Sequence, residues 1–274
     1  MAEQRTTRTP ESMSNTSMNN QSMLANAGST AVDYGSEAVG SPAQQEPWIH
    51  SSELITRLPG MTFRFGKRAF DIVASVFGLL VFALLLPALA LLIKLDSPGS
   101  VFYGQDRVGI NRRRQRDGQA NDDRRKVLQP GRPFKIYKLR TMCSNAEAGG
   151  PQWAGANDSR ITRIGGFLRK SRLDELPQLW NVLKGEMSLI GPRPERLYFI
   201  RQLENDVPNY HDRLLVKPGL TGLAQVRNGY DSDLESVKRK VEYDRQYIQG
   251  AGPLNEVGIL VQTVRVVLKG EGAR

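Results

Sequence analysis

The sequence predicts an α+β fold, mainly helical with a small β element, anchored to a membrane by a re-entrant helix that is kinked at a proline. Three observations predict it. A long apolar run, Ile72–Ile93, contains Pro87 and has basic residues on both sides. Helical periodicity occurs at 171–185 and again at 254–269, and the segment 134–142 has the composition of a short strand.

Residues 1–58 are expected to form a disordered N-terminal tail. They are rich in Ser, Asn, Gln and small residues, and they contain too few large apolar side chains to build a core. The segment also lacks the compact apolar run of a secretory signal peptide. A role in binding a partner is the alternative to a solvated tail.

Residues 59–96 are predicted to anchor the chain in a membrane. The apolar run is long enough for about 33 Å of helix. Its flanking basic residues are Arg57, Arg64, Lys67 and Arg68 before it and Lys94, Arg107 and the cluster 112–116 after it. This charge distribution draws both ends to the cytoplasmic side. Pro87 removes a helix hydrogen bond and clashes with the carbonyl of Ala83. A helix that dips into the bilayer and returns satisfies both observations, whereas a buried core helix is the alternative.

The remaining residues, 97–274, are expected to form a domain at the cytoplasmic face of the membrane. The chain of 274 residues has a formal net charge of +10, which predicts an anionic partner: a phosphorylated substrate, an anionic lipid surface or a nucleic acid. Cys143 is the single cysteine, so no intramolecular disulfide can form. With only His50 and His211, a His-rich metal site is excluded.

A basic insertion, 110–132, interrupts this domain with two Arg-rich clusters. No aromatic residue lies between the charges to stack on bases, so no nucleic acid is expected as a partner. We expect a mobile surface loop near an anionic leaflet, where each Lys or Arg contributes about 1 kcal/mol of attraction.

The segment 171–194 combines two adjacent carboxylates, Asp174 and Glu175, with an amphipathic helix and a Pro-Arg-Pro turn. The apolar face expected for the helix comprises Leu176, Leu179, Trp180 and Leu183. Gly185 is the expected C-terminal stop. Asp174 is expected to be the N-cap, because Pro177 then falls in the first turn, where no backbone donor is lost. An ionised carboxylate would thus lie at a helix N-terminus, where phosphate also binds well.

Several motifs resemble one family. They are KRAFD (67–71), KLDSPGSVFYGQDRVG (94–109), FKIYKLRTM (134–142), RITRIGGFLRK (160–170), SRLDELPQLWNVLKGEMSLIGPRP (171–194) and VKPGLTGLAQV (216–226). In this order they resemble the bacterial sugar transferases, the monotopic phosphoglycosyl transferases that act on polyprenyl phosphates. Arg227-Asn228-Gly229-Tyr230 and the ending TVRVVLKGEGAR look like the subgroup tied to exopolysaccharide assembly.

The resemblance implies an activity and a location. A sugar 1-phosphate would pass from a UDP-sugar to polyprenol (undecaprenyl) phosphate, with release of UMP, as the first membrane step of exopolysaccharide or related glycan assembly. Asp174 would be the nucleophile that forms a covalent phosphosugar intermediate and binds Mg²⁺, and Glu175 would orient metal or substrate. The catalytic domain would lie on the cytoplasmic face of the bacterial inner membrane. The family's re-entrant helix is often broken at a Ser-Pro pair, whereas Leu86 precedes Pro87 here.

Four cations are candidates for binding phosphate. Arg193 lies between two prolines, so its guanidinium loses little entropy when it grips a phosphate. The resemblance favours the same role for Lys138 and Arg140, which could otherwise protect an edge strand. Arg163 lies just upstream of the carboxylates.

Two questions stay open at this stage. The helix predicted at 254–269 has an apolar stripe that would suit either core packing or a helix lying on the bilayer; it comprises Val257, Leu260, Val261, Val264 and Leu268. Two other functions remain alternatives to catalysis: a membrane-tethered protein that binds anionic lipid or nucleic acid, and a structural scaffold. No motif decides which sugar is used.

Overall fold

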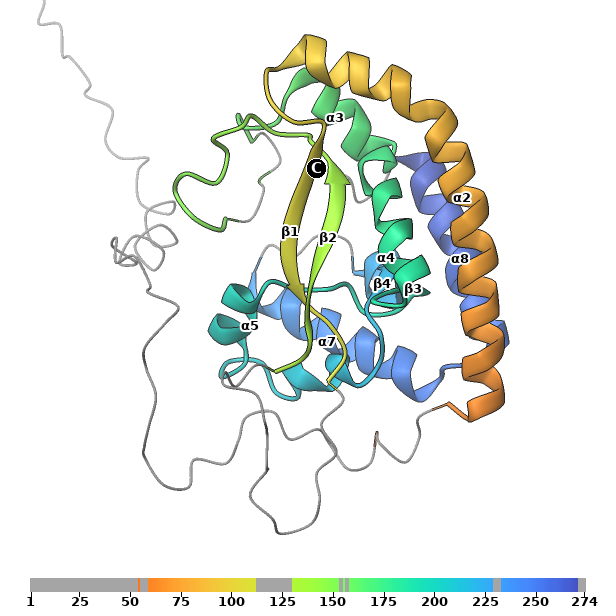
Figure 1. The fold of residues 1–274 in the computed structure, drawn as a ribbon. Coiled ribbons are helices and arrows are strands. Elements are labelled where there is room, and N and C mark those ends of the chain that lie inside the picture. Colours follow the sequence, from red (N-terminus) through yellow and green to blue (C-terminus); the bar gives the residue numbers. More distant parts are fainter. Residues whose placement is uncertain are drawn as a thin grey trace, which may run out of the picture. The chain divides into compact units, whose positions relative to one another are not determined.

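Helices dominate the computed structural model, and two small two-stranded sheets lie among them (Figure 1). The structure describes residues 54, 59–111, 130–152, 155, 158–228 and 233–270. All of them belong to one compact unit, Glu46–Arg274. The predicted tail, apart from Leu54, and most of the basic insertion lie outside the described residues. The predicted fold class is therefore confirmed as mostly helical with small sheets.

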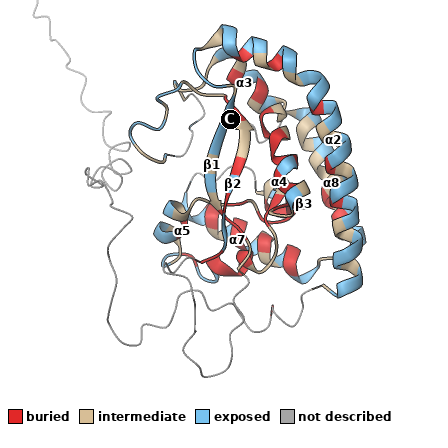
Figure 2. Cartoon of the chain, viewed as in Figure 1, coloured by how far each residue is buried: buried red, intermediate tan, exposed pale blue. Residues whose placement is uncertain are grey.

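The apolar run lies within one long helix, α2, Met61–Asp96, which continues through Pro87. The ribbon of α2 curves: its first half passes beside α8, Pro253–Lys269, and its second half bends toward α3, Arg163–Lys170 (Figure 1). Most of its surface is exposed (Figure 2). By length and composition α2 is able to cross a membrane, and its re-entrant course stays a prediction.

One stripe of α2 packs against the rest of the unit. The buried residues on it are Asp71, Ser75, Phe82, Leu89 and Ile93. Polar contacts fix both ends of the helix. Near the start, Lys67 Nζ lies 2.5 Å from Glu256 Oε2 of α8, and Arg68 donates to the carbonyl of Val182 at 2.6 Å. Near the end, Asp96 accepts a hydrogen bond of 2.9 Å from the backbone N–H of Ile164.

The larger sheet is an antiparallel pair of β1, Phe102–Val108, and β2, Pro133–Leu139. The strand predicted from FKIYKLRTM is therefore confirmed, although it ends at Leu139. Tyr103 lies opposite Lys138 in the register. The alternate residues Phe134 and Ile136 are buried, so one face of β2 packs into the core and positions Lys138 beside the segment that follows α3.

That segment starts with a 3₁₀ helix, η1, Leu173–Gln178, and continues as α4, Leu179–Lys184. The predicted N-cap at Asp174 is wrong. Arg172, in a left-handed conformation with φ 60°, precedes η1, and Asp174 is already its second residue. Pro177 is tolerated because it lies within the 3₁₀ helix, before α4 begins. Gly185, with φ 81°, ends α4 as predicted.

The predicted apolar face of this segment is only partly confirmed. Leu179 and Val182 are buried, but Trp180 is 51% exposed and Asn181 is fully buried instead. A 3₁₀ helix and an α-helix have different numbers of residues per turn, so the change at Leu179 rotates the side chains away from the positions that a single α-helix would give them. Leu179 packs on Gly78 of α2, where an added Cβ would lie 2.6 Å from Leu179 Cδ1. Gly78 therefore lets the two helices approach closely.

The second sheet pairs two short parallel strands, β3, Ser188–Ile190, and β4, Gly219–Thr221. The other elements are α5, Leu197–Leu203; η2, Tyr210–Leu215; α6, Leu223–Arg227; and α7, Leu234–Gln249. Leu54, which falls within the predicted tail, is buried beside Ile190, Leu223 and Ile248.

Helix α8 buries Glu256 and Ile259 and leaves most of its apolar stripe in the open. Four members of the stripe, Val257, Val261, Val264 and Leu268, have 47–82% of their surface accessible, and Leu254 at the start of the helix is 90% exposed. The fifth member, Leu260, packs against the core cluster that contains Ile248 and Ile259. Core packing therefore accounts for one edge of the stripe and not for the exposed residues.

Candidate active site

Asp174 and Glu175 lie in the first turn of η1, and both are buried, at 6% and 7% exposure. The left-handed Arg172 turns the chain between α3 and η1, and the backbone N–H of Glu175 donates to the Arg172 carbonyl at 3.1 Å. This turn places the carboxylates against β2, whose residues form the opposite wall. Because 3₁₀ neighbours project in different directions, the two acids have separate surroundings.

Two cations bind Glu175. Lys138 Nζ lies 2.8 Å from Glu175 Oε1, and Arg193 donates to the same oxygen at 2.5 Å and to Oε2 at 3.4 Å. Burial acts to raise the pKa of Glu175, but Arg193 and Lys138 outweigh it and hold this pKa well below its usual range. Glu175 is therefore ionised over the whole physiological pH range.

Asp174 is different. Its buried Oδ1 has no hydrogen-bond partner among the described residues. Burial raises the pKa of Asp174 to about 6; the charge of Glu175 adds to the rise, while Lys138, Arg193 and Arg169 oppose it. A carboxylate with an uncommitted oxygen and a raised pKa is a stronger nucleophile than one held by hydrogen bonds. At neutral pH it is ionised and available.

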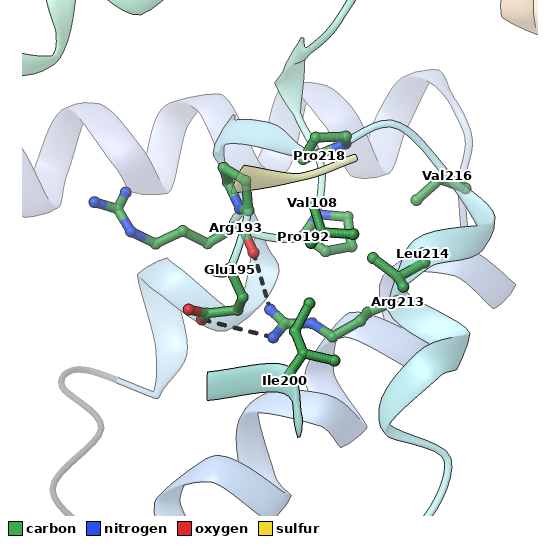
Figure 3. A pocket seen from close by; sticks show the side chains of 10 residues that line it. Val108, Pro192, Arg193, Glu195, Ile200, Arg213, Leu214, Val216 and Pro218 are labelled. Carbon is green, nitrogen blue, oxygen red and sulfur yellow. Dashed lines mark hydrogen bonds and ion pairs between the residues drawn. The ribbon is translucent and has the colours of Figure 1, made fainter. Parts of the chain in front are cut away.

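The structure brings together four of the predicted site residues: Asp174, Glu175, Lys138 and Arg193. Arg193 belongs to the Pro-Arg-Pro turn that follows β3, and its side chain points away from the small cavity beneath that turn (Figure 3). Arg193 and Lys138 keep 30% and 19% of their side-chain surface accessible. Both cations can therefore bind Glu175 and still reach an incoming anion.

The other two predicted cations lie elsewhere. Arg140 is buried, and its guanidinium donates to the carbonyls of Ser97 and Pro98 at 2.6 and 2.5 Å, so it closes the C-terminal end of α2. Arg163 is exposed in the first turn of α3. The structure does not bring either residue to the carboxylate pair, and their roles in binding phosphate stay predictions.

Sequence reasoning missed two features of the site. Arg169, in the last turn of α3, is close enough to lower the pKa of Asp174 by its charge; its position depends on the left-handed turn at Arg172. A group of buried and half-buried charges behind the Pro-Arg-Pro turn was also missed. Its members are Arg107, Glu195, Arg213, Lys240 and Asp244. The sequence signal that could have revealed this group is the presence of charged residues next to apolar segments.

The donor set fits the Mg²⁺ predicted on Asp174. Oδ1 of Asp174 is a carboxylate oxygen without a partner in the described part of the chain, and oxygen is the ligand that Mg²⁺ prefers. The described residues include no group of three or more His, Cys, Asp or Glu that could hold a metal. An ion here would therefore take most of its ligands from a diphosphate and from water, as Mg²⁺ commonly does in phosphate sites.

Two adjacent buried acids and the two cations that bind Glu175 make up the candidate site. The comparisons with known proteins name the family. A family model described as bacterial sugar transferase matches residues 62–270. The chain belongs to the bacterial sugar transferase family, as its motifs predicted.

Individual relatives agree with this assignment. The chain is 42% identical to the UDP-N-acetylgalactosamine-undecaprenyl-phosphate N-acetylgalactosaminephosphotransferase of Aeromonas hydrophila, over 82% of this chain and 49% of that protein. It is 36% identical to the UDP-glucose:undecaprenyl-phosphate glucose-1-phosphate transferase of Caulobacter vibrioides, over 81% of this chain and 79% of that protein. It is 37% identical to the undecaprenyl-phosphate galactose phosphotransferase of Salmonella typhimurium, over 77% and 42%. The chain thus spans about half the length of two of these three relatives.

Proposed function

We propose that this protein transfers a sugar 1-phosphate from a UDP-sugar to undecaprenyl phosphate and releases UMP. The observation that carries the proposal is the contrast within the acid pair: Asp174 has a free buried oxygen, whereas Glu175 is saturated by Lys138 and Arg193. The relatives' names contain three different sugars joined to the same lipid carrier. They support the reaction class and leave the sugar open.

In the first step, the Asp174 carboxylate attacks the phosphorus that carries the sugar. A new P–O bond forms to Asp174, the P–O bond to the UMP oxygen breaks, and UMP leaves with the electron pair. The attack joins two anions, so cations must offset their repulsion. Arg193 and Lys138 lie beside the pair, and both keep part of their side-chain surface accessible to a diphosphate. Mg²⁺, when bound, supplies further neutralisation of the diphosphate charge.

In the second step, a phosphate oxygen of the lipid attacks the same phosphorus. The P–O bond to Asp174 breaks, so the carboxylate is restored and a polyprenyl diphospho-sugar is released. Glu175, ionised throughout, holds Lys138 and Arg193 in position during both steps. The product would begin the assembly of an exopolysaccharide or a related glycan.

We place the protein at the cytoplasmic face of the inner membrane, and its exposed apolar surface supports the contact with lipid that this location requires. On α2 the large residues Leu84 and Phe77 are 82% and 69% exposed, and on α8 Leu254 and Leu268 are 90% and 82% exposed. Trp180 of α4 and Phe167 of α3 add two exposed aromatic rings. So much exposed apolar surface is typical of contact with lipid or protein. A re-entrant α2, with α8 lying on the bilayer, would place the acid pair near the lipid phosphates.

The test is an assay of UMP release by the full-length protein in detergent, with undecaprenyl phosphate, Mg²⁺ and a panel of UDP-sugars. We expect UMP release with one or a few of the UDP-sugars. Release over multiple turnovers should require the lipid. Without lipid, intact-protein mass spectrometry should detect a phosphosugar adduct. The matched control is Asp174→Asn, which should give neither product. A wild-type protein that is folded but inactive with every sugar would refute the proposal.

A further inference from the structure

The backbone of the Pro-Arg-Pro turn is held entirely from outside the turn. Prolines have no N–H, so the segment 192–195 has few donors of its own. Each of its four successive carbonyls nevertheless accepts a hydrogen bond. The pairs are Gly219 N to Pro192 O at 2.8 Å, Arg213 Nη2 to Arg193 O at 3.1 Å, Arg107 Nη1 to Pro194 O at 2.9 Å, and Val108 N to Glu195 O at 2.9 Å.

Two of these four donors are side chains. Arg213 of η2 is 3% exposed, and its guanidinium lies between the Arg193 carbonyl and the Glu195 carboxylate (Figure 3). Arg107 of β1 reaches the next carbonyl along the chain. Together they fix the orientation of both peptide planes that follow Arg193. Proline restricts φ but leaves ψ free, so these donors supply the restraint that proline does not.

The two arginines are held in turn by two acids, the half-buried Glu195 and the buried Asp244. Glu195 lies 3.6 Å from both guanidinium groups and 2.6 Å from Lys240 Nζ. Asp244, 1% exposed, lies 2.9 Å from Arg213 Nη2. Burial acts to raise the pKa of Glu195, but the cations Lys240, Arg213 and Arg107 outweigh it and hold this pKa at about 2. Glu195 therefore stays ionised at neutral pH, and both guanidinium groups have an anionic partner in it.

We propose that Arg213 and Arg107 are positioning residues that hold the Arg193 backbone so that its guanidinium lies on Glu175, beside the attacking carboxylate. Neither residue touches Asp174 or Glu175 in any contact of the described chain; each acts through Arg193. The inference rests on the proposed function, because it concerns the orientation of a cation that binds the substrate diphosphate. Displacements of about 1 Å in such groups cost up to about 100-fold in rate.

The experiment is a double-mutant cycle on UMP release with the full-length protein. The variants are Arg213→Lys, Arg193→Ala and the double variant. Lys keeps the charge beside Asp244 but cannot donate to Asp244, Tyr210 and the Arg193 carbonyl in the same geometry. We expect Arg213→Lys to lower kcat/KM for the UDP-sugar about 10- to 100-fold in the wild-type background. In the Arg193→Ala background the same change should cost less than about threefold, because the group it positions is gone.

The matched control is Arg245→Lys on α7. Arg245 also forms an ion pair with a buried acid, Asp212, at 3.1 Å, but has no contact with the turn. We expect its kcat/KM to stay within about twofold of the wild type, as for independent sites. Melting temperatures of all variants identify any that fail to fold. If Arg213→Lys does not fold, Arg107→Lys, which alters the bond to Pro194, goes through the same cycle and decides the matter.

The outcomes separate this proposal from the proposed function. Wild-type turnover with coupled losses in the cycle supports both. Wild-type turnover with equal losses in the two backgrounds, or with no loss on Arg213→Lys, overturns the positioning role and leaves the transferase activity standing. An inactive wild type overturns the proposed function, and the positioning role falls with it.

Discussion

The surroundings of Asp174 and those of Glu175 differ sharply, although the residues are adjacent in one 3₁₀ helix. On the Glu175 side, two cations are within 2.8 Å and the carboxyl pKa is held low. On the Asp174 side, one carboxylate oxygen has no partner among the described residues and the pKa rises to about 6. Burial is equal on the two sides, so the partners alone create the difference.

The comparison teaches how one short segment supplies two functions. Buried ion pairs add order rather than large stability, and Glu175 uses them to fix the cations. In the proposed mechanism, Asp174 stays available to attack because those cations are already bound to its neighbour. The surroundings of a buried acid therefore indicate its role better than its burial does.

The largest expected effect comes from removing the charge of Asp174. Asp174→Asn should lower turnover by at least about a thousandfold, since a covalent catalyst is lost. It should also stabilise the protein at pH 7.5, by on the order of 1–3 kcal/mol, because a buried charge with few partners is removed. UMP release and thermal unfolding measure the two effects.

The pH dependence of that stabilisation follows from the sign of the shift. The pKa of Asp174 is higher in the folded state, so the folded protein binds its proton more tightly than the unfolded chain does. Wild-type stability should therefore fall as pH rises from about 4 to about 6, relative to Asp174→Asn. If the free energy of unfolding depends on pH in the same way in the two proteins, burial does not raise the pKa of Asp174.

A smaller loss of turnover is expected from a change at Glu175. Glu175→Gln leaves Lys138 and Arg193 without their anion, and we expect turnover to fall about 100-fold through displaced cations. Here stability should fall, by about 1–3 kcal/mol, because a partly buried ion-pair group is broken. A Glu175→Gln protein that is more stable than wild type would contradict the contrast between the two acids.

Arg193→Lys tests whether the shape of the cation matters. Arg193 donates from two nitrogens to the two oxygens of Glu175, and an ammonium cannot reproduce that fork. We expect a loss of about tenfold in kcat/KM for the UDP-sugar, from a hydrogen bond to a charged group worth about 1.5 kcal/mol. Arg201→Lys, the same change at an exposed arginine of α5, is the comparison, and an equal loss there would show that the effect is not specific to the Arg193 fork.

The smallest effect concerns the acid limb of the pH–rate profile. Because Asp174 must be ionised to attack, kcat/KM should fall about tenfold per pH unit below about pH 6 and be level above it. Glu175→Gln should move this limb to lower pH, since the negative charge of Glu175 helps to raise the pKa of Asp174. A limb that stays in place would show that the two carboxyl groups do not interact.

Much of the site could be predicted from the sequence. The strand β2, the helix end at Gly185 and the long apolar helix α2 depend on local patterns, and local patterns survive in the fold. Asp174, Glu175, Lys138 and Arg193 were expected in one site, and they lie together. The resemblance to the family decided this, because spacing alone does not bring β2 and the Pro-Arg-Pro turn to the same acids.

The errors have physical causes. The N-cap expected at Asp174 assumed one α-helix, whereas a 3₁₀ segment tolerates Pro177 and moves the start of the α-helix to Leu179. Arg140 was expected to share the phosphate-binding role of Lys138 because the resemblance to the family favoured it. The strand ends at Leu139, however, and Arg140 turns to the end of α2. Tertiary contacts decide where the chain leaves a strand or changes from one type of helix to another, and no local sequence pattern contains those contacts.

The contacts at both ends of α2 have one more consequence. Lys67 and Arg68 tie the start of the helix to α8 and α4, while Arg140 and Asp96 tie its end to β2 and α3. If α2 lies in a bilayer, a helix fixed at both ends in this way would set the height of the acid pair above the acyl chains. It would also keep the rest of the protein from rotating relative to the helix. The soluble donor would then have to arrive from the water, whereas the lipid acceptor would reach the pair by lateral diffusion within the leaflet.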